Sequence, residues 1–137
     1  NKPSIEFFEG WDEVQKIYLQ SLEAESVYAL GSTKKLTELM GGGFFANYEK
    51  EVKKRHIIIN DILTADSKEA GAKTAAVLGP LYTAKFLDAK YGELPTDILI
   101  WNDHIALISL EEPIFGTVIT NANLTKTFRA LHNILRS

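Results

Sequence analysis

Three short apolar runs lie close together in the segment 96–120, which reads TDILIWNDHIALISLEEPIFGTVIT. The runs 98–101, 105–110 and 115–119 are rich in β-branched or aromatic side chains, and each is too short for a helix of ordinary length. Asn102 and Asp103 separate the first two runs as a hairpin turn, because both residue types accept the positive φ of such turns. The middle run has almost no polar alternation, which indicates a strand covered on both faces. The segment therefore predicts three consecutive strands within a sheet.

The rest of the chain alternates between strand and helix patterns. Strands are expected at 4–8, 26–30, 56–60 and 81–88, and helices at 11–22, 33–40, 44–55, 66–78 and from about 121 to the end. Ser32 or Thr33 is expected to cap the second helix, and Asn121 or Asn123 the last. This alternation predicts an α/β fold with a mixed β-sheet flanked by helices on both faces.

The sequence also makes four local predictions. Glycines 41–43 are too costly in entropy to continue a helix, so they are expected to form a joint between two helices. Residues 61–64 are expected to form a loop, with Asp66 capping the helix that follows. The last helix is expected to bury an apolar face made of Leu124, Phe128, Leu131 and Leu135.

Composition limits the classes of function. A chain of 137 residues with 45% hydrophobic content fits one globular domain. Fifteen basic residues against eighteen acidic ones argue against a domain whose main surface binds nucleic acid. The absence of cysteine excludes disulfides and thiolate metal sites and fits a reducing compartment, so a cytoplasmic protein is expected. No apolar run approaches the length of a membrane span, and no membrane partner is expected.

Catalytic and metal-binding patterns are sparse. His56, His104 and His132 lie in separate predicted elements without a partner at metal-ligand spacing, so structural or solvated roles are favoured for all three. The Gly-Ser-Thr at 31–33 is not the G-x-S-x-G turn of a hydrolase, and the triple glycine is not followed by G-K-[ST]. We therefore expect no catalytic residue, no metal site and no cofactor.

The opening PSIEFFEGWDEVQKIY resembles the P-x-[IV]-x-F-[YF]-E-G start of the effector domains that follow a winged helix in TrmB-type transcriptional regulators. The resemblance continues through the strand ending at Gly31, the basic helix end at 53–55 and the hairpin at 98–109, so it spans nearly the whole chain. It implies a phospholipase-D-like fold behind an upstream winged helix. The sequence begins at Asn1 and its single methionine is Met40, so we expect a fragment of a longer protein.

Phospholipase-D enzymes carry the signature H-x-K-x-x-x-x-D, in which the histidine attacks phosphorus and the lysine neutralises the phosphoryl oxygens. With Asp103 in the aspartate position, Thr96 stands in the histidine position and Ile98 in the lysine position. The resemblance therefore implies a domain without this chemistry. A diverged phosphodiesterase that uses His104 is an alternative, although Ala106 stands where its lysine is expected. A pure protein-interaction module is a second alternative.

The sequence thus predicts that residues 1–137 form a single, non-enzymatic sensory and dimerisation domain of a TrmB-like regulator. Its expected partners are a small-molecule effector and a second copy of the chain, with DNA bound only through a domain outside this sequence. Because α/β sheets generally receive ligands at the carboxyl ends of their strands, the effector site is expected there. The candidate ligand-binding residues are Ser32, Thr33, Asp61, Asn121 and Asn123.

Overall fold

A seven-stranded mixed sheet forms the centre of the computed structural model, which describes residues 2–137 apart from the side-chain environment of residue 42. The strands are β1 (Ser4–Glu9), β2 (Ser26–Gly31), β3 (Ile58–Leu63), β4 (Tyr82–Phe86), β5 (Thr96–Trp101), β6 (His104–Ser109) and β7 (Phe115–Thr120). They are ordered β1-β7-β6-β5-β2-β3-β4 across the sheet. The neighbours β2, β3 and β4 are parallel, whereas every other neighbouring pair is antiparallel. The three consecutive strands at 96–120 are therefore confirmed.

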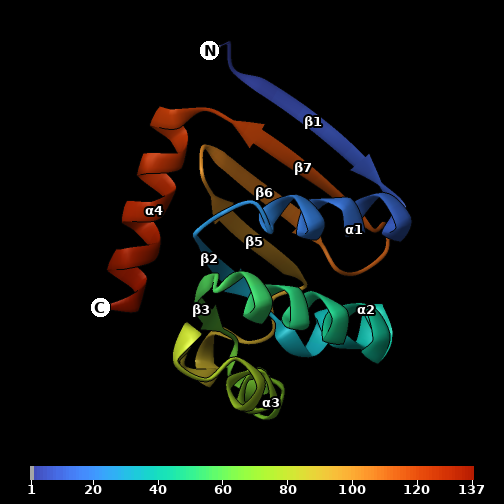
Figure 1. Ribbon diagram of the computed structural model, residues 1–137, viewed down its shortest axis with the longest axis vertical. Coiled ribbons are helices and arrows are strands. Elements are labelled where there is room, and N and C mark those ends of the chain that lie inside the picture. The colour runs from blue at the N-terminus through green and yellow to red at the C-terminus, as the bar shows by residue number, and fades with distance from the viewer. Residues whose placement is uncertain (1) are drawn as a thin grey trace.

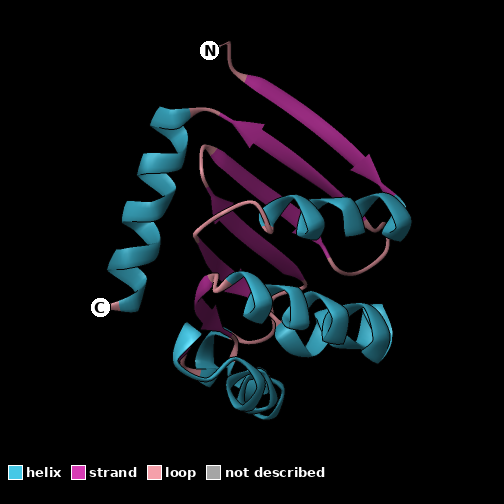
Figure 2. Ribbon diagram, in the orientation of Figure 1, coloured by secondary structure: helices cyan, strands magenta, loops and turns pink. Residues whose placement is uncertain are grey.

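Helices cover the two faces of the sheet unequally. The helices are α1 (Gly10–Ser21), α2 (Thr33–Arg55), α3 (Lys68–Leu78) and α4 (Ala122–Arg136). Figure 1 shows α1 and α2 lying across one face, with α3 beside α2, while α4 runs along the side of the opposite face. In Figure 2 the magenta strands form one continuous layer between these helices. The α/β fold with helices on both faces is confirmed.

The core explains why these segments take these forms. Val14, Ile17 and Tyr18 recur at helical spacing on α1 and are fully or almost fully buried against the sheet. Asn102 supplies the tight turn between β5 and β6 with a φ of 49°, as expected for an asparagine in a hairpin. Gly41 adopts a φ of 66° and a ψ of 172° inside α2, so the predicted joint is present and divides α2 into two helical parts.

Three local predictions were wrong. Residues 61–63 are not a loop, because β3 continues through Asp61 to Leu63 and pairs with both β2 and β4. Asp66 does not cap the next helix, since a 3-10 turn (Ala65–Ser67) precedes α3 and Asp66 lies within it. The predicted apolar face of α4 is only partly covered, because Leu124, Leu131 and Leu135 remain about half exposed, while Thr125 and His132 are buried instead.

Candidate functional site

A small cavity lies between the sheet and the helices α1, α2 and α3. The space open to the centres of water molecules is about 50 Å³, enough for roughly three to five waters. Its wall combines aliphatic and aromatic groups with oxygen-bearing side chains. The polar and aromatic members are Tyr18, Thr33, Phe45, Tyr48, Glu49, Asp61, Thr74, Tyr82 and Asp97. An interior space with two aspartates is unusual, because ionised carboxylates are rarely buried without a cationic partner.

Asp97 lies near the start of β5 with its side chain directed to the helical face that carries α1 and α2. Its residue is only 6% exposed, and the Tyr18 hydroxyl donates a 2.7 Å hydrogen bond to Oδ2. Burial raises the pKa of the Asp97 carboxyl to about 7; the Tyr18 hydrogen bond lowers this pKa, and the nearby Asp61 raises it. Asp97 therefore changes charge near neutral pH.

Asp61 lies in the middle of β3, opposite Ala29 in the parallel pairing with β2. The Tyr82 hydroxyl donates a 2.6 Å hydrogen bond to its Oδ2. Burial raises the pKa of the Asp61 carboxyl to about 6, and the Tyr82 hydrogen bond opposes this rise. Asp61 is half-buried overall, and its remaining accessible surface fits its place in the cavity wall. Two tyrosine–aspartate pairs thus come from four different elements, α1, β3, β4 and β5.

No basic side chain neutralises these carboxylates within residues 2–137. The ion pairs there join Lys35 to Glu93 and Glu111, Arg55 to Glu51, and Lys73 to Glu69, all outside the cavity. Burial also raises the pKa of the three cavity tyrosines, to about 12 for Tyr48, so these hydroxyls stay protonated and act as hydrogen-bond donors. The cavity therefore presents negative charge without a resident cation.

Glu49 lies at the boundary between this cavity and an outer groove. The groove is formed by α2 and α3 and shares Phe45, Glu49 and Thr74 with the cavity. Glu49 Oε2 is buried without a hydrogen-bond partner. Burial raises the pKa of the Glu49 carboxyl, while a bond from Thr74 lowers it. A third carboxylate thus stands where the cavity meets the surface.

The structure brings together three of the five sequence-predicted residues. Thr33 and Asp61 line the cavity. Ser32 precedes Thr33 and caps α2, with its Oγ accepting from the Lys35 N–H at 3.1 Å. Asn121 instead caps α4 by accepting from Leu124 N–H, and Asn123 is exposed on the same helix. The expectation that all five meet was wrong because β7 runs antiparallel to β2, so its carboxyl end lies at the opposite edge of the sheet.

Sequence reasoning missed the groups that matter most in the cavity. Asp97 lies just outside the apolar run predicted at 98–101, although it belongs to β5 and faces the interior. Its orientation follows from the two-residue period of a strand, because that period places Asp97 on the same face as Leu99 and Trp101. Tyr18 and Tyr82 carried no signal of a polar site, since an aromatic residue on a buried face is usually core packing.

The positions of the phospholipase-D signature lie on the other side of β5. Thr96 and Ile98 alternate with Asp97 along the strand, and Ile98 lines an apolar pocket beneath α4 with Phe128 and Leu131. His104 Nδ1 lies 2.8 Å from the Thr120 hydroxyl, and its ring centroid is 5.1 Å from that of Trp101.

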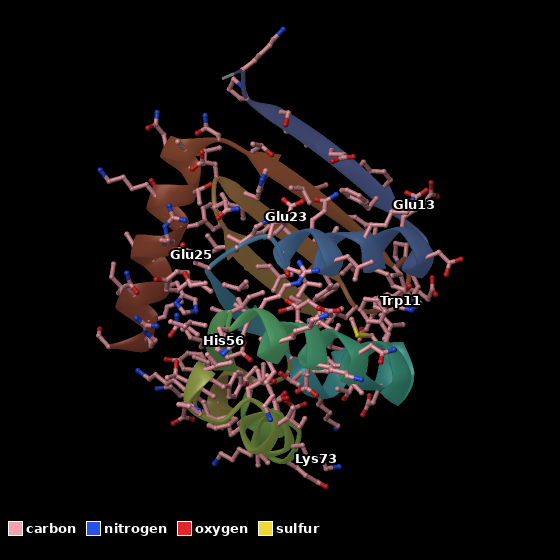
Figure 3. All side chains as sticks on the ribbon, in the orientation of Figure 1. Trp11, Glu13, Glu23, Glu25, His56 and Lys73 are labelled. Carbon is pink, nitrogen blue, oxygen red and sulfur yellow. The ribbon has the colours of Figure 1, made fainter. Side chains whose placement is uncertain are left out.

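Figure 3 labels three side chains that bear on the other sequence-based interpretations, His56, Lys73 and Trp11. His56 is exposed at the end of α2, and Lys73 projects from α3. Trp11 lies at the start of α1, where its ring meets Phe44 of α2 edge-to-face at 5.9 Å. Trp11 therefore packs between two helices, as the commoner use of a tryptophan at a helix contact predicts.

Comparison with solved structures decides the fold. NucT from Helicobacter pylori, a phospholipase-D-like nuclease, superimposes with a TM-score of 0.62 at 18% identity, covering 96% of this chain and 94% of NucT. TrmBL2, an archaeal chromatin protein with a novel mode of DNA binding, gives a TM-score of 0.65 at 12% identity and 96% coverage of this chain. The chain has a phospholipase-D-like fold.

These similarities concern the fold alone, because both identities are low. The chain spans about half of TrmBL2, of which 51% is covered. No protein-family model matches the sequence, and no curated protein matches it. Within residues 2–137, no helix is sufficiently long and apolar to cross a membrane.

Proposed function

We propose that this chain is a non-enzymatic sensory and dimerisation domain of a TrmB-like transcription regulator. The observation that supports the proposal lies in β5. With Asp103 in the aspartate position of the phospholipase-D signature, Thr96 and Ile98 of β5 stand in the histidine and lysine positions. Neither side chain can attack phosphorus as an imidazole does or neutralise a phosphoryl oxygen as an ammonium does. The resemblance to TrmB-type effector domains and the TrmBL2 fold support the regulatory role.

Hydrolysis of a generic phosphodiester such as bis-p-nitrophenyl phosphate tests the non-enzymatic part. We expect no turnover above the uncatalysed rate. His104→Ala is the matched variant, because His104 is the histidine closest in sequence to the lost signature. Turnover that disappears in His104→Ala would establish a diverged phosphodiesterase and overturn the proposal.

The sensory part requires a ligand that binds one state of the domain better than another. The cavity bordered by Thr33 and Asp61 is the proposed effector site, because it combines enclosed space with polar groups. Thermal unfolding with separate panels of neutral sugars, small amines and small anions tests it. Ala29→Val is expected to abolish any stabilising shift, since Ala29 lines the cavity and two added methyl groups occupy much of it.

Ala130→Val supplies the matched control for that experiment. Ala130 is exposed on α4, on the opposite side of the sheet, so its extra methyl groups reach no part of the cavity. A ligand shift that survives Ala29→Val would move the effector site elsewhere. The absence of any shift across all three panels would favour a pure interaction module.

A second copy of the chain is the partner proposed for the α4 side of the sheet. Exposed apolar side chains gather there from β1 and α4: Ile5, Phe7, Leu124, Leu131, Ile134 and Leu135. The register places Ile5 and Phe7 on the same face as Ile98 and Ile100, which α4 covers. Large apolar groups on one side of a sheet commonly mark an interface, and symmetric homodimers are the commonest assemblies.

Sedimentation equilibrium tests this dimer. Ile134→Glu places a charge at the most exposed apolar position of α4 and is expected to produce monomers. Leu19→Glu is the matched control, because Leu19 is also exposed but lies on α1 at the other face. Wild-type protein that remains monomeric at high concentration would remove dimerisation from the proposal. DNA binding is assigned to a separate winged helix, and the acidic balance of this chain agrees with that division.

A further inference from the structure

We propose that the cavity binds a small primary ammonium ion, of the size of ammonium or methylammonium, between Asp61 and Asp97. This inference rests on the proposed effector role of the cavity and names the chemical class of its ligand. It depends on four features of the site: uncompensated carboxylates, aromatic walls, enclosed volume and an acidic opening.

The first feature is a buried carboxylate without a cationic partner. Asp97 is more than nine-tenths buried, and it accepts hydrogen bonds from the Tyr18 hydroxyl and the Ile98 backbone N–H, but no ion pair among the described residues involves it. Asp61 is arranged similarly, with Tyr82 on Oδ2. A buried anion costs several kcal/mol unless a cation or a proton compensates it. A cationic ligand supplies that compensation above the pH at which the carboxyls lose their protons.

Aromatic rings make the rest of the wall suitable for an ammonium group. Tyr18, Tyr48, Tyr82 and Phe45 all line the same space. Ring faces attract ammonium groups, and this attraction is stronger where water is excluded. The hydroxyl of Thr33 adds a neutral acceptor in the same wall. Divalent metals fit less well, because no group of three His, Cys, Asp or Glu side chains converges to hold one in the part of the chain described.

The volume limits the ligand to a few heavy atoms. A space of about 50 Å³ for water centres corresponds to roughly three to five waters. Ammonium and methylammonium fit this space, whereas tetramethylammonium is too bulky and has no N–H to donate. The cavity therefore selects for a compact cation that retains hydrogen-bond donors.

Glu49 provides a route from the surface. Its side chain is shared between the cavity and the groove of α2 and α3, and its Oε2 has no partner in the structure. A carboxylate at this boundary attracts a cation from the groove toward the interior. Phe45 and Thr74 form the rest of the shared boundary.

Ionisation of the carboxyl groups in the cavity wall makes ammonium binding depend on pH. The titratable groups that face the cavity are Tyr18 of α1, Tyr48 and Glu49 of α2, Asp61 of β3, Tyr82 of β4 and Asp97 of β5. Asp61 and Asp97 are protonated at pH 5 and largely ionised at pH 8, given pKa values of about 6 and about 7. An ammonium ion is therefore bound at pH 8 and not at pH 5.

Thermal unfolding at pH 8 with methylammonium chloride, matched in ionic strength by sodium chloride, tests the inference. At ten times Kd the unfolding equilibrium constant is expected to fall about ten-fold, and the shift is expected to vanish at pH 5. Saturation-transfer NMR on the methyl group of methylammonium reports binding directly. Asp97→Asn and Asp61→Asn are both expected to abolish the shift and the NMR signal while remaining folded, because each removes a buried charge.

Asp12→Asn is the matched control, because Asp12 is exposed in the first turn of α1, and it is expected to retain both signals. Equal stabilisation by sodium or potassium chloride, or by tetramethylammonium, overturns the ammonium assignment. So does binding that persists in both cavity variants. A sugar or anion shift that Ala29→Val abolishes, with no response to methylammonium, refutes this inference while leaving the proposed sensory function intact.

Discussion

Replacing Asp97 by asparagine removes a buried charge while keeping the shape of the side chain. In the wild-type protein the folded state holds the Asp97 proton more tightly than the unfolded chain, because burial raises the folded pKa from 3.8 to about 7. Folding therefore takes up a proton between about pH 4 and pH 7. The free energy of unfolding must fall as the pH rises through this window, and the contribution of Asp97 must level off above it.

The magnitude follows from the size of the shift. A rise of about three pKa units lowers the free energy of unfolding by about 4 kcal/mol when the Asp97 carboxyl changes from protonated to ionised. Asparagine avoids this cost at pH 8 and still accepts the Tyr18 hydrogen bond, but its amide N–H groups add a desolvation cost of about 1–2 kcal/mol. We expect Asp97→Asn to stabilise the protein by about 2–3 kcal/mol at pH 8, and to be neutral or slightly destabilising at pH 4.

Urea unfolding of both proteins at pH 4, 6 and 8, without amines in the buffer, measures this difference. The wild-type free energy of unfolding is expected to fall more steeply with pH than that of the variant. Asp12→Asn, at an exposed site, is expected to keep the wild-type slope. Parallel pH profiles for Asp97→Asn and wild type, or destabilisation by Asp97→Asn at every pH, would refute the view that this carboxylate is buried without compensation.

Three further substitutions test the packing around the site. Gly31→Ala is expected to lower the free energy of unfolding in urea by about 3 kcal/mol, because the added Cβ would lie 2.5 Å from the Thr96 carbonyl oxygen and 2.9 Å from the Asp97 Cα. Gly43→Ala is the control and is expected to cost nothing, because the space around Gly43 is open. Ile17→Ala is expected to cost about 3–4 kcal/mol, because Ile17 is fully buried. Leu19→Ala is expected to cost less than about 1 kcal/mol, because Leu19 is half exposed on the same helix. Equal losses would contradict the assigned buried face of α1. Ser32→Ala removes the cap of α2 and is expected to cost about 1 kcal/mol, with Ser32→Asn restoring most of it; a loss that Asn fails to restore points to packing instead of capping.

The sequence was sufficient for the fold because the relevant signals are local. Periodicity located α1, turn chemistry located the hairpin at Asn102, and glycine entropy located the joint at Gly41. The end of β3 was misplaced because Asn60 and Asp61 are turn-forming types, and their polarity outweighed the strand pattern. In the folded chain the Asp61 side chain faces the cavity, where it accepts a hydrogen bond from the Tyr82 hydroxyl of the neighbouring strand.

The cavity could not be predicted to the same extent because it depends on distant pairing. Tyr18 and Asp97 are 79 residues apart, and no local pattern specifies that they meet. Strand direction was the second missing piece. The carboxyl ends of two strands lie at the same edge of a sheet only when the strands are parallel. Because β7 runs antiparallel to β2, Asn121 lies far from Ser32. A correct strand order from sequence would have removed that error.

Strand β2 lines the cavity on one side of the sheet and contacts α4 on the other. Ala29 presents its side chain to the cavity, while its carbonyl oxygen lies 2.9 Å from His132 Nε2 of α4. His132 is buried, and its ring meets Tyr28 edge-to-face at 5.3 Å. A ligand in the cavity would therefore contact a strand that is hydrogen-bonded to α4 on the other side of the sheet. We propose this hydrogen bond as the route of coupling between the two sites.

His132→Leu tests that connection, because it retains apolar packing against Tyr28 and removes the bond to Ala29. The proposed dimerisation of the wild-type protein, measured by sedimentation at pH 8, is expected to respond to a cavity ligand. The variant is expected to bind the ligand but to show little or no response. His56→Leu, at an exposed histidine, is the control. An unchanged response in His132→Leu would show that the cavity and the α4 surface communicate by another route, because the variant lacks the hydrogen bond between α4 and Ala29.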